Sequence, residues 1–138
     1  MGARREGREM ALQALYLSDV CGLQIPSALK AALKQEFPET VKEFSRHLVK
    51  GVIENKEEID RILRLYAENW ELNRMASVDR NILRLSAFEI LSDVETPVSV
   101  IIDEAIEIAK TYSTGDSGKF VNGILDKVKK ERKESRKP

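Results

Sequence analysis

The stretch PVSVIIDEAIEIAKTY, residues 97–112, decides the fold class, because its apolar residues recur at helical spacing. They stand at i, i+3, i+4, i+7 and i+10, namely Ile102, Ala105, Ile106, Ala109 and Tyr112. This spacing places them on one face of an α-helix and predicts that the face packs inward. Ser99 is the expected N-cap after Pro97, and Gly115 is expected to end the helix with a positive φ.

The helical period continues outward from this stretch, and no segment alternates strictly as a half-buried β-strand does. Downstream, Asp116 or Ser117 is the expected cap of a last helix. Upstream, helices are predicted over about 4–20, with Gly22 as the stop, over 26–33, from 38 onward with a bend at Asn55, and over 78–91 with Ser77 as the cap. The prediction is an all-α fold, a compact bundle of about seven helices.

Composition describes one ordinary domain of 138 residues, with 42% hydrophobic residues and 23 basic against 23 acidic side chains. The charge is unevenly spread, because basic residues gather at both ends. Arg4, Arg5 and Arg8 lie in the first eight residues. We expect a helical domain over residues 1–131 and a frayed basic tail over 132–138, where the charges are solvated.

Several classes of protein are excluded by what the chain contains. Cys21 is the single cysteine and His47 the single histidine, so neither an internal disulfide nor a His-rich metal site is possible. Asp103 and Glu107 lie i, i+4 but lack further oxygen ligands, so no metal is expected. No catalytic constellation can be assembled, and we expect no cofactor and no enzyme. Without an apolar span or signal peptide, the expected compartment is the cytoplasm.

The first helix is predicted to have one face that packs in the core and an opposite face that carries arginine side chains and a tyrosine. Arg5 and Tyr16 lie almost in line, about three turns apart. Arginine pairs with phosphate and an aromatic ring stacks on bases, a combination that suits single-stranded RNA. The alternative is a core tyrosine behind a solvated helix start, and the residues alone favour it.

The turn TGDSGK, residues 114–119, is similar at a glance to a phosphate loop. It fails as a Walker motif, because only two residues separate Gly115 from Gly118 and Phe120 follows Lys119. Open amides at a helix start still favour anions, with Lys119 adding charge and Phe120 a stacking face. The alternative, favoured for this segment alone, is an ordinary junction with Phe120 in the core.

Glu89 falls on the apolar face formed by Val78, Ile82 and Leu85. A carboxylate there needs a partner, and Arg8 is the one we expect. Asp79 and Arg80 point elsewhere and are free to face another protein.

Three separated blocks together resemble the NusB family. They are ARREGREMALQALY at 3–16, VDRNILRL followed by Phe88-Glu89-Ile90 at 78–90, and Pro97 with IDEAIEIAK at 102–110 continuing into DSGKFVNGILD at 116–126. The resemblance implies two perpendicular three-helix subdomains. It also implies transcription antitermination by binding boxA of nascent ribosomal RNA together with NusE, a small-subunit ribosomal protein, to assist RNA polymerase.

Carried over by position, the resemblance implies RNA contacts from the first helix and from the last-helix junction. They are Arg4, Arg5, Arg8, Gln13, Tyr16, Asp116, Ser117, Lys119 and Phe120. The NusE contacts would be Asp79 and Arg80. The RNA mechanism requires that packing bring these two helix starts together. A protein-binding adaptor and a module associated with ribosomal RNA processing or methylation are the alternatives, and a homodimer is possible.

Overall fold

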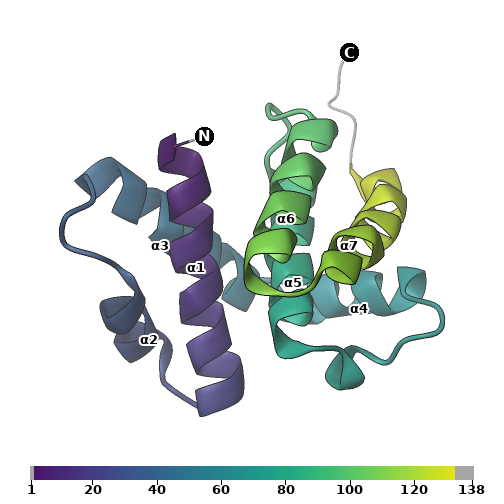
Figure 1. Ribbon diagram of the computed structural model, residues 1–138, viewed down its shortest axis with the longest axis horizontal. Helices are drawn as coiled ribbons and strands as arrows, with labels where there is room; N and C mark the ends of the chain where they lie inside the picture. The colour runs from purple at the N-terminus through teal and green to yellow at the C-terminus, as the bar shows by residue number, and fades with distance from the viewer. Residues whose placement is uncertain (1, 133–138) are drawn as a thin grey trace.

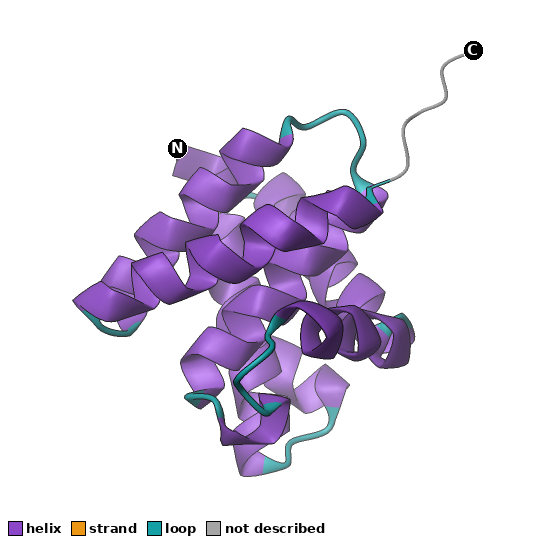
Figure 2. Cartoon of the chain, turned by 90° about the vertical axis from the view of Figure 1, so that its right-hand side faces the viewer, coloured by secondary structure: helices purple, strands orange, loops and turns teal. Residues whose placement is uncertain are grey.

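The computed structural model describes residues 2–132, and in this part of the chain seven α-helices and two 3₁₀ turns occur without any strand (Figures 1 and 2). The elements are α1 (Gly2–Cys21), α2 (Ile25–Ala32), α3 (Glu39–Glu54), α4 (Lys56–Tyr66), η1 (Leu72–Arg74), α5 (Ser77–Ser92), α6 (Val98–Tyr112), α7 (Gly115–Val128) and η2 (Lys129–Glu131). The predicted all-α fold with seven helices is confirmed, including the break at Asn55 between α3 and α4.

The helices form two groups that share one core. α1 packs against α2 and α3, whereas α5 packs against α6, α7 and α4 (Figure 1). α1 also packs along α5 and so joins the groups. The second group therefore includes α4 beside α5, α6 and α7. Residues 81–90 of α5 are buried without interruption, which makes α5 the central helix of the molecule.

Helix ends differ from the expected ones in several places. Gly22 ends α1 with a φ of +76°, as predicted. The N-caps of α5, α6 and α7 are Ala76, Pro97 and Thr114, each ahead of the predicted residue. Gly115 begins α7 and has no positive φ, so the prediction that it closes α6 is wrong. In each case the Ser or Asp that was predicted as the N-cap already lies within the helix.

A buried ion pair joins α1 to α5. Arg8 Nε lies 2.8 Å from Glu89 Oε1, and Arg8 Nη2 lies 2.9 Å from Glu89 Oε2. Their side chains are 7% and 3% exposed. The predicted partnership is confirmed, and it occupies the guanidinium that the resemblance assigned to RNA.

The first residue of the predicted tail contacts the end of α5. Arg132 Nε donates to the carbonyl of Ile90 at 2.8 Å, and its Nη2 donates to the carbonyl of Asp93. The other tail residues, 133–138, lie outside the described part of the chain. Within the described part, no helix combines the length and the apolar character needed to cross a membrane.

Candidate nucleic-acid interface

The three arginines of α1 have different surroundings. Arg4 is exposed, and its guanidinium lies 4.1 Å from the ring centroid of Phe44. Arg5 is partly exposed and pairs with Glu104 on α6, with Nη2 and Oε2 3.1 Å apart. Hydrogen bonds from Arg5 lower the pKa of the Glu104 carboxyl, although partial burial opposes this shift. Arg8 is buried and cannot offer its charge to a ligand without leaving Glu89 unpaired.

Gln13 and Tyr16 line a groove of about 480 Å³ along α1, which we call the α1 groove. Its wall also includes Met10, Phe37, Val78 and Tyr112. Gln13 is exposed and Tyr16 is half-buried, so an amide and a phenol both reach the surface of this groove. The groove therefore offers hydrogen bonds beside aromatic faces, as a site for nucleotide bases does.

Tyr112 was predicted to point inward, and this is wrong, because it is 50% exposed. At 100° per residue it lies about 80° from Ile102, at the edge of the apolar stripe. Its ring instead borders the α1 groove. Burial of part of the side chain raises the pKa of the Tyr112 hydroxyl, and the nearby Glu9 carboxylate adds to the shift.

The start of α7 presents a charged side chain on either side of a buried serine. Asp116 and Lys119 are exposed, whereas Ser117 is 5% exposed. Ser117 Oγ accepts a hydrogen bond from the amide of Thr114 at 3.4 Å, within a capping box. Ser117 thus holds the helix start in place, and Lys119 with the half-buried Phe120 forms its outer surface.

A hydrogen bond ties the start of α7 to the start of α5. Ser117 Oγ donates to Asp79 Oδ2 at 3.1 Å. Asp79 is 8% exposed, and its Oδ1 is a buried atom without a hydrogen-bond partner among the described residues. Val78, the residue before Asp79, lines the α1 groove. The α1 groove, with Gln13 and Tyr16, and the α7 start therefore flank the same end of α5. Arg4 and Arg5 at the start of α1 instead contact Phe44 on α3 and Glu104 on α6, so the structure brings only the Gln13–Tyr16 part of the first predicted group towards the second.

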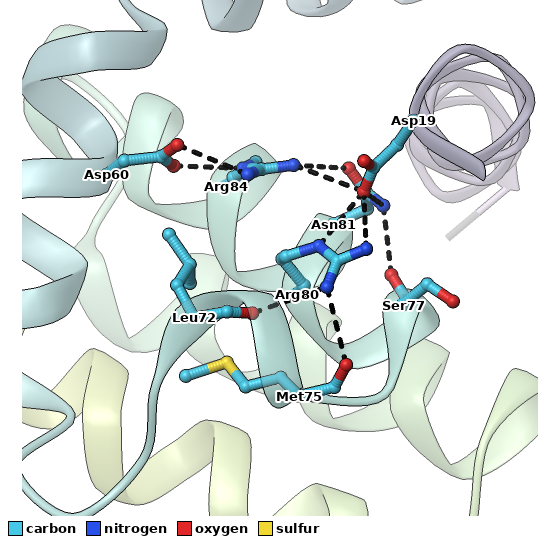
Figure 3. A network of polar contacts seen from close by, with 8 residues as sticks. All are labelled: Asp19, Asp60, Leu72, Met75, Ser77, Arg80, Asn81 and Arg84. Atoms are coloured by element: carbon cyan, nitrogen blue, oxygen red, sulfur yellow. Dashed lines mark hydrogen bonds and ion pairs between the residues drawn. The ribbon is translucent and has the colours of Figure 1, made fainter. Parts of the chain in front are cut away.

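Arg80, predicted to face a protein partner, is held in a polar network (Figure 3). Its Nε donates to Asp19 Oδ2 at 2.9 Å, and its Nη1 donates to the carbonyl oxygens of Leu72 and Met75. Asp19 is also bound by Asn81 at the end of α1. The network fastens α1, η1 and α5 to one another and leaves Arg80 only slightly exposed.

Burial alone would raise the pKa of the Asp19 carboxyl. Hydrogen bonds from Asn81 and Arg80, with the charges of Arg80 and Arg84, outweigh burial and lower that pKa. Arg84 in turn makes a two-bond contact to Asp60 at 2.9 and 3.1 Å. These charges are matched within the protein.

Trp70 is an exposed aromatic residue that the sequence analysis did not single out. It lies between α4 and η1, with 57% of its surface exposed. Its ring centroid lies 5.3 Å from that of Phe120, with the planes at 75°. The sequence carries a signal that Trp70 is exposed, because the apolar stripe of α4 ends at Tyr66 and the neighbours of Trp70, Asn69 and Glu71, are polar.

Over residues 2–132, no group of three or more His, Cys, Asp or Glu side chains is placed to hold a metal ion. Cys21 is exposed. The fold and the surface together define a small all-helical protein that presents amides, aromatic rings and side chains of both charges, among them Glu6, Glu9 and Lys34, around one end of its central helix.

The model of the NusB family matches residues 5–130, and the chain belongs to this family. A protein of Elusimicrobium minutum named transcription antitermination protein NusB is 46% identical, with 96% of this chain and 97% of that protein covered. A protein of the same name from Symbiobacterium thermophilum is 44% identical, with 91% and 88% covered.

Solved structures agree with this assignment. NusB of T. maritima superposes with a TM-score of 0.87 at 42% identity, covering 94% of this chain and 92% of that one. A crystal structure of antitermination factors NusB and NusE in complex with dsRNA has a matching chain with a TM-score of 0.85 at 26% identity, covering 94% and 98%.

Proposed function

We propose that this protein is a transcription antitermination factor that binds boxA of nascent ribosomal RNA together with NusE and assists RNA polymerase past terminators. The names of its relatives and the NusB–NusE–RNA crystal structure support this function. The observation that carries it is the meeting of the α1 groove and the α7 start at one end of α5. The role is binding rather than catalysis, and it belongs in the bacterial cytoplasm, where transcription takes place.

The proposed RNA contacts are a subset of those implied by resemblance. Exposed or half-buried side chains make the contacts: Arg4, Arg5, Gln13, Tyr16, Asp116, Lys119 and Phe120. Arg8 and Ser117 are buried, and we assign them to holding α1 and α7 in position. We take the RNA to be single-stranded, because stacking on Tyr16 and Phe120 requires bases that are free to leave a helix.

The test is an anisotropy titration of a labelled 12-nucleotide boxA-like RNA at several salt concentrations. Lys119→Ala should flatten the slope of log K against log salt by about 0.7, the contribution of one phosphate contact on a single strand. Phe120→Ala should weaken binding about 5- to 150-fold through lost stacking, with the slope unchanged.

Lys30→Ala on α2, which lies across α1 from α6 and α7 in Figure 1, is the matched control and should change neither quantity. If a Lys119→Ala, Phe120→Ala double variant kept the RNA affinity and the salt slope of the unmodified protein, the α7 start would not be part of the interface. Equal affinity for the same RNA in duplex form would contradict the single-strand proposal.

For NusE we propose contacts near Asp79 and Arg80. Asp79 is 8% exposed and its Oδ1 is buried without a partner among the described residues, so a donor from a docked protein would reach that oxygen only if the start of α5 opened on binding. A gel-shift titration with and without NusE tests this, because NusE should raise the affinity for RNA. Binding of NusE with no effect on RNA affinity would favour the adaptor alternative.

A further inference from the structure

We propose that Trp70 is a second stacking residue of the RNA interface, binding a nucleobase next to the one held by Phe120. The inference rests on the proposed RNA-binding function and extends it from α7 onto the segment between α4 and η1.

Phe120 covers at most one face of the Trp70 indole. In an edge-to-face pair, one ring presents its edge to a face of the other. If Trp70 supplies the edge, Phe120 covers neither indole face; if Phe120 supplies the edge, it covers only one of them. With 57% of its surface exposed, Trp70 is open to solvent and to ligands over more than half of that surface. A large exposed ring beside a second ring forms a stacking platform.

Trp70 shares its groove with an arginine that is available to a phosphate. Trp70 borders a groove of about 760 Å³, the Trp70 groove, which also contains Arg64, Asn69 and Asn73. Each of its four carboxylates faces a cation, in the pairs Asp19–Arg80, Asp60–Arg84, Glu68–Lys127 and Glu71–Arg74. Arg64, which lines the groove, is exposed and has no carboxylate partner among residues 2–132. The residues that line the groove carry four carboxylates and three guanidinium groups, and the remaining counter-charges come from Lys127 and Arg74, which lie outside the lining. Arg64 is therefore the one charged lining residue without an opposite partner among the described residues.

The polar side chains of the groove suit bases as well as phosphates. Asn69 and Asn73 are exposed amides, which both donate and accept hydrogen bonds. Lys119 is exposed one residue before Phe120, so a cation stands on the α7 side of the ring pair as Arg64 stands on the other. A strand stacked on Phe120 would thus meet a second ring and a second cation on leaving α7. This continuity favours RNA over a protein segment as the ligand of Trp70.

The experiment uses the fact that Trp70 is the only tryptophan of the chain. Its fluorescence is recorded while the 12-nucleotide boxA-like RNA is added, and the anisotropy of labelled RNA is measured in parallel. Stacking should quench the fluorescence along the anisotropy curve. Trp70→Ala should weaken binding about 5- to 150-fold, and Trp70→Phe should restore much of the loss.

Val94→Ala, which removes an exposed apolar side chain between α5 and α6, is the control and should leave affinity unchanged. Unaltered fluorescence with full affinity in Trp70→Ala would overturn the inference while leaving the proposed function intact. Quenching by NusE but not by RNA would overturn it in favour of a protein contact. Absence of RNA binding by the unmodified protein would overturn the proposed function itself, and the inference with it.

Discussion

Arg8 and Glu89 show how a single charged residue in the first helix serves the fold. Moving a guanidinium and a carboxylate out of water costs several kcal/mol per ion, and two short parallel hydrogen bonds offset this cost. The pair fixes α1 against α5, and through α5 it sets the position of the α1 groove. Arg8, which the family resemblance assigned to RNA contact, therefore acts by holding α1 in position and does not contact the ligand itself.

Glu89→Gln should lower the free energy of unfolding by about 3–5 kcal/mol, because the Arg8 charge stays buried without a counter-charge. Urea denaturation followed by circular dichroism measures the change. Glu107→Gln is the control: its contact with Lys110 is exposed and 3.5 Å long, and the loss should be below about 1 kcal/mol. A Glu89→Gln protein with the melting temperature of the unmodified protein would show that the ion pair does not stabilise the fold.

At the scale of elements, Gly51 determines how closely α3 approaches α5. A Cβ atom at this position would lie 2.0 Å from Cζ of Phe88, so the Phe88 ring rests directly on the backbone of α3. Gly7 on α1 is similar, since a Cβ there would lie 2.7 Å from the Phe44 ring of α3. Two glycines thus allow helices to pack at short range around the shared core.

Gly51→Ala should destabilise the protein by about 1–3 kcal/mol, because the Phe88 ring or the α3 backbone must move. Gly123→Ala, in the exposed part of α7 with nothing near the added carbon, should stabilise it by about 0.5–1 kcal/mol through helix propensity. Thermal melts of both variants measure this opposite pair of shifts. Stabilisation by Gly51→Ala would disprove the close contact of α3 with Phe88.

The helices themselves were predictable from apolar spacing, and the Arg8–Glu89 pair from the need of a buried carboxylate for a partner. The burial of Ser117 and Asp79 was not predictable, because both are polar residues at helix starts, where exposed side chains are expected, and only the packing of α7 against α5 brings them together. Helical period alone does not place α7 against α5. The exposure of Trp70 could have been predicted from its polar neighbours, but its pairing with Phe120 could not, since only the fold brings the two rings together.

At the scale of the whole molecule, α5 organises both functional regions. Its first turn carries Val78 into the α1 groove and Asp79 to the start of α7, while Arg80 is tied to the end of α1. Because these three residues are consecutive, the two sides of the proposed interface cannot move apart without disturbing α5. We therefore regard the α1 groove and the α7 start as one surface.

The most direct test of this claim is an NMR titration of the isotope-labelled protein with the 12-nucleotide boxA-like RNA. If the two regions form one surface, amide signals of Gln13 and Tyr16 on α1 and of Lys119 and Phe120 on α7 should shift together, along one saturation curve that ends at one RNA per protein. Shifts confined to one of the two helices, or separate saturation curves for them, would contradict a single RNA surface.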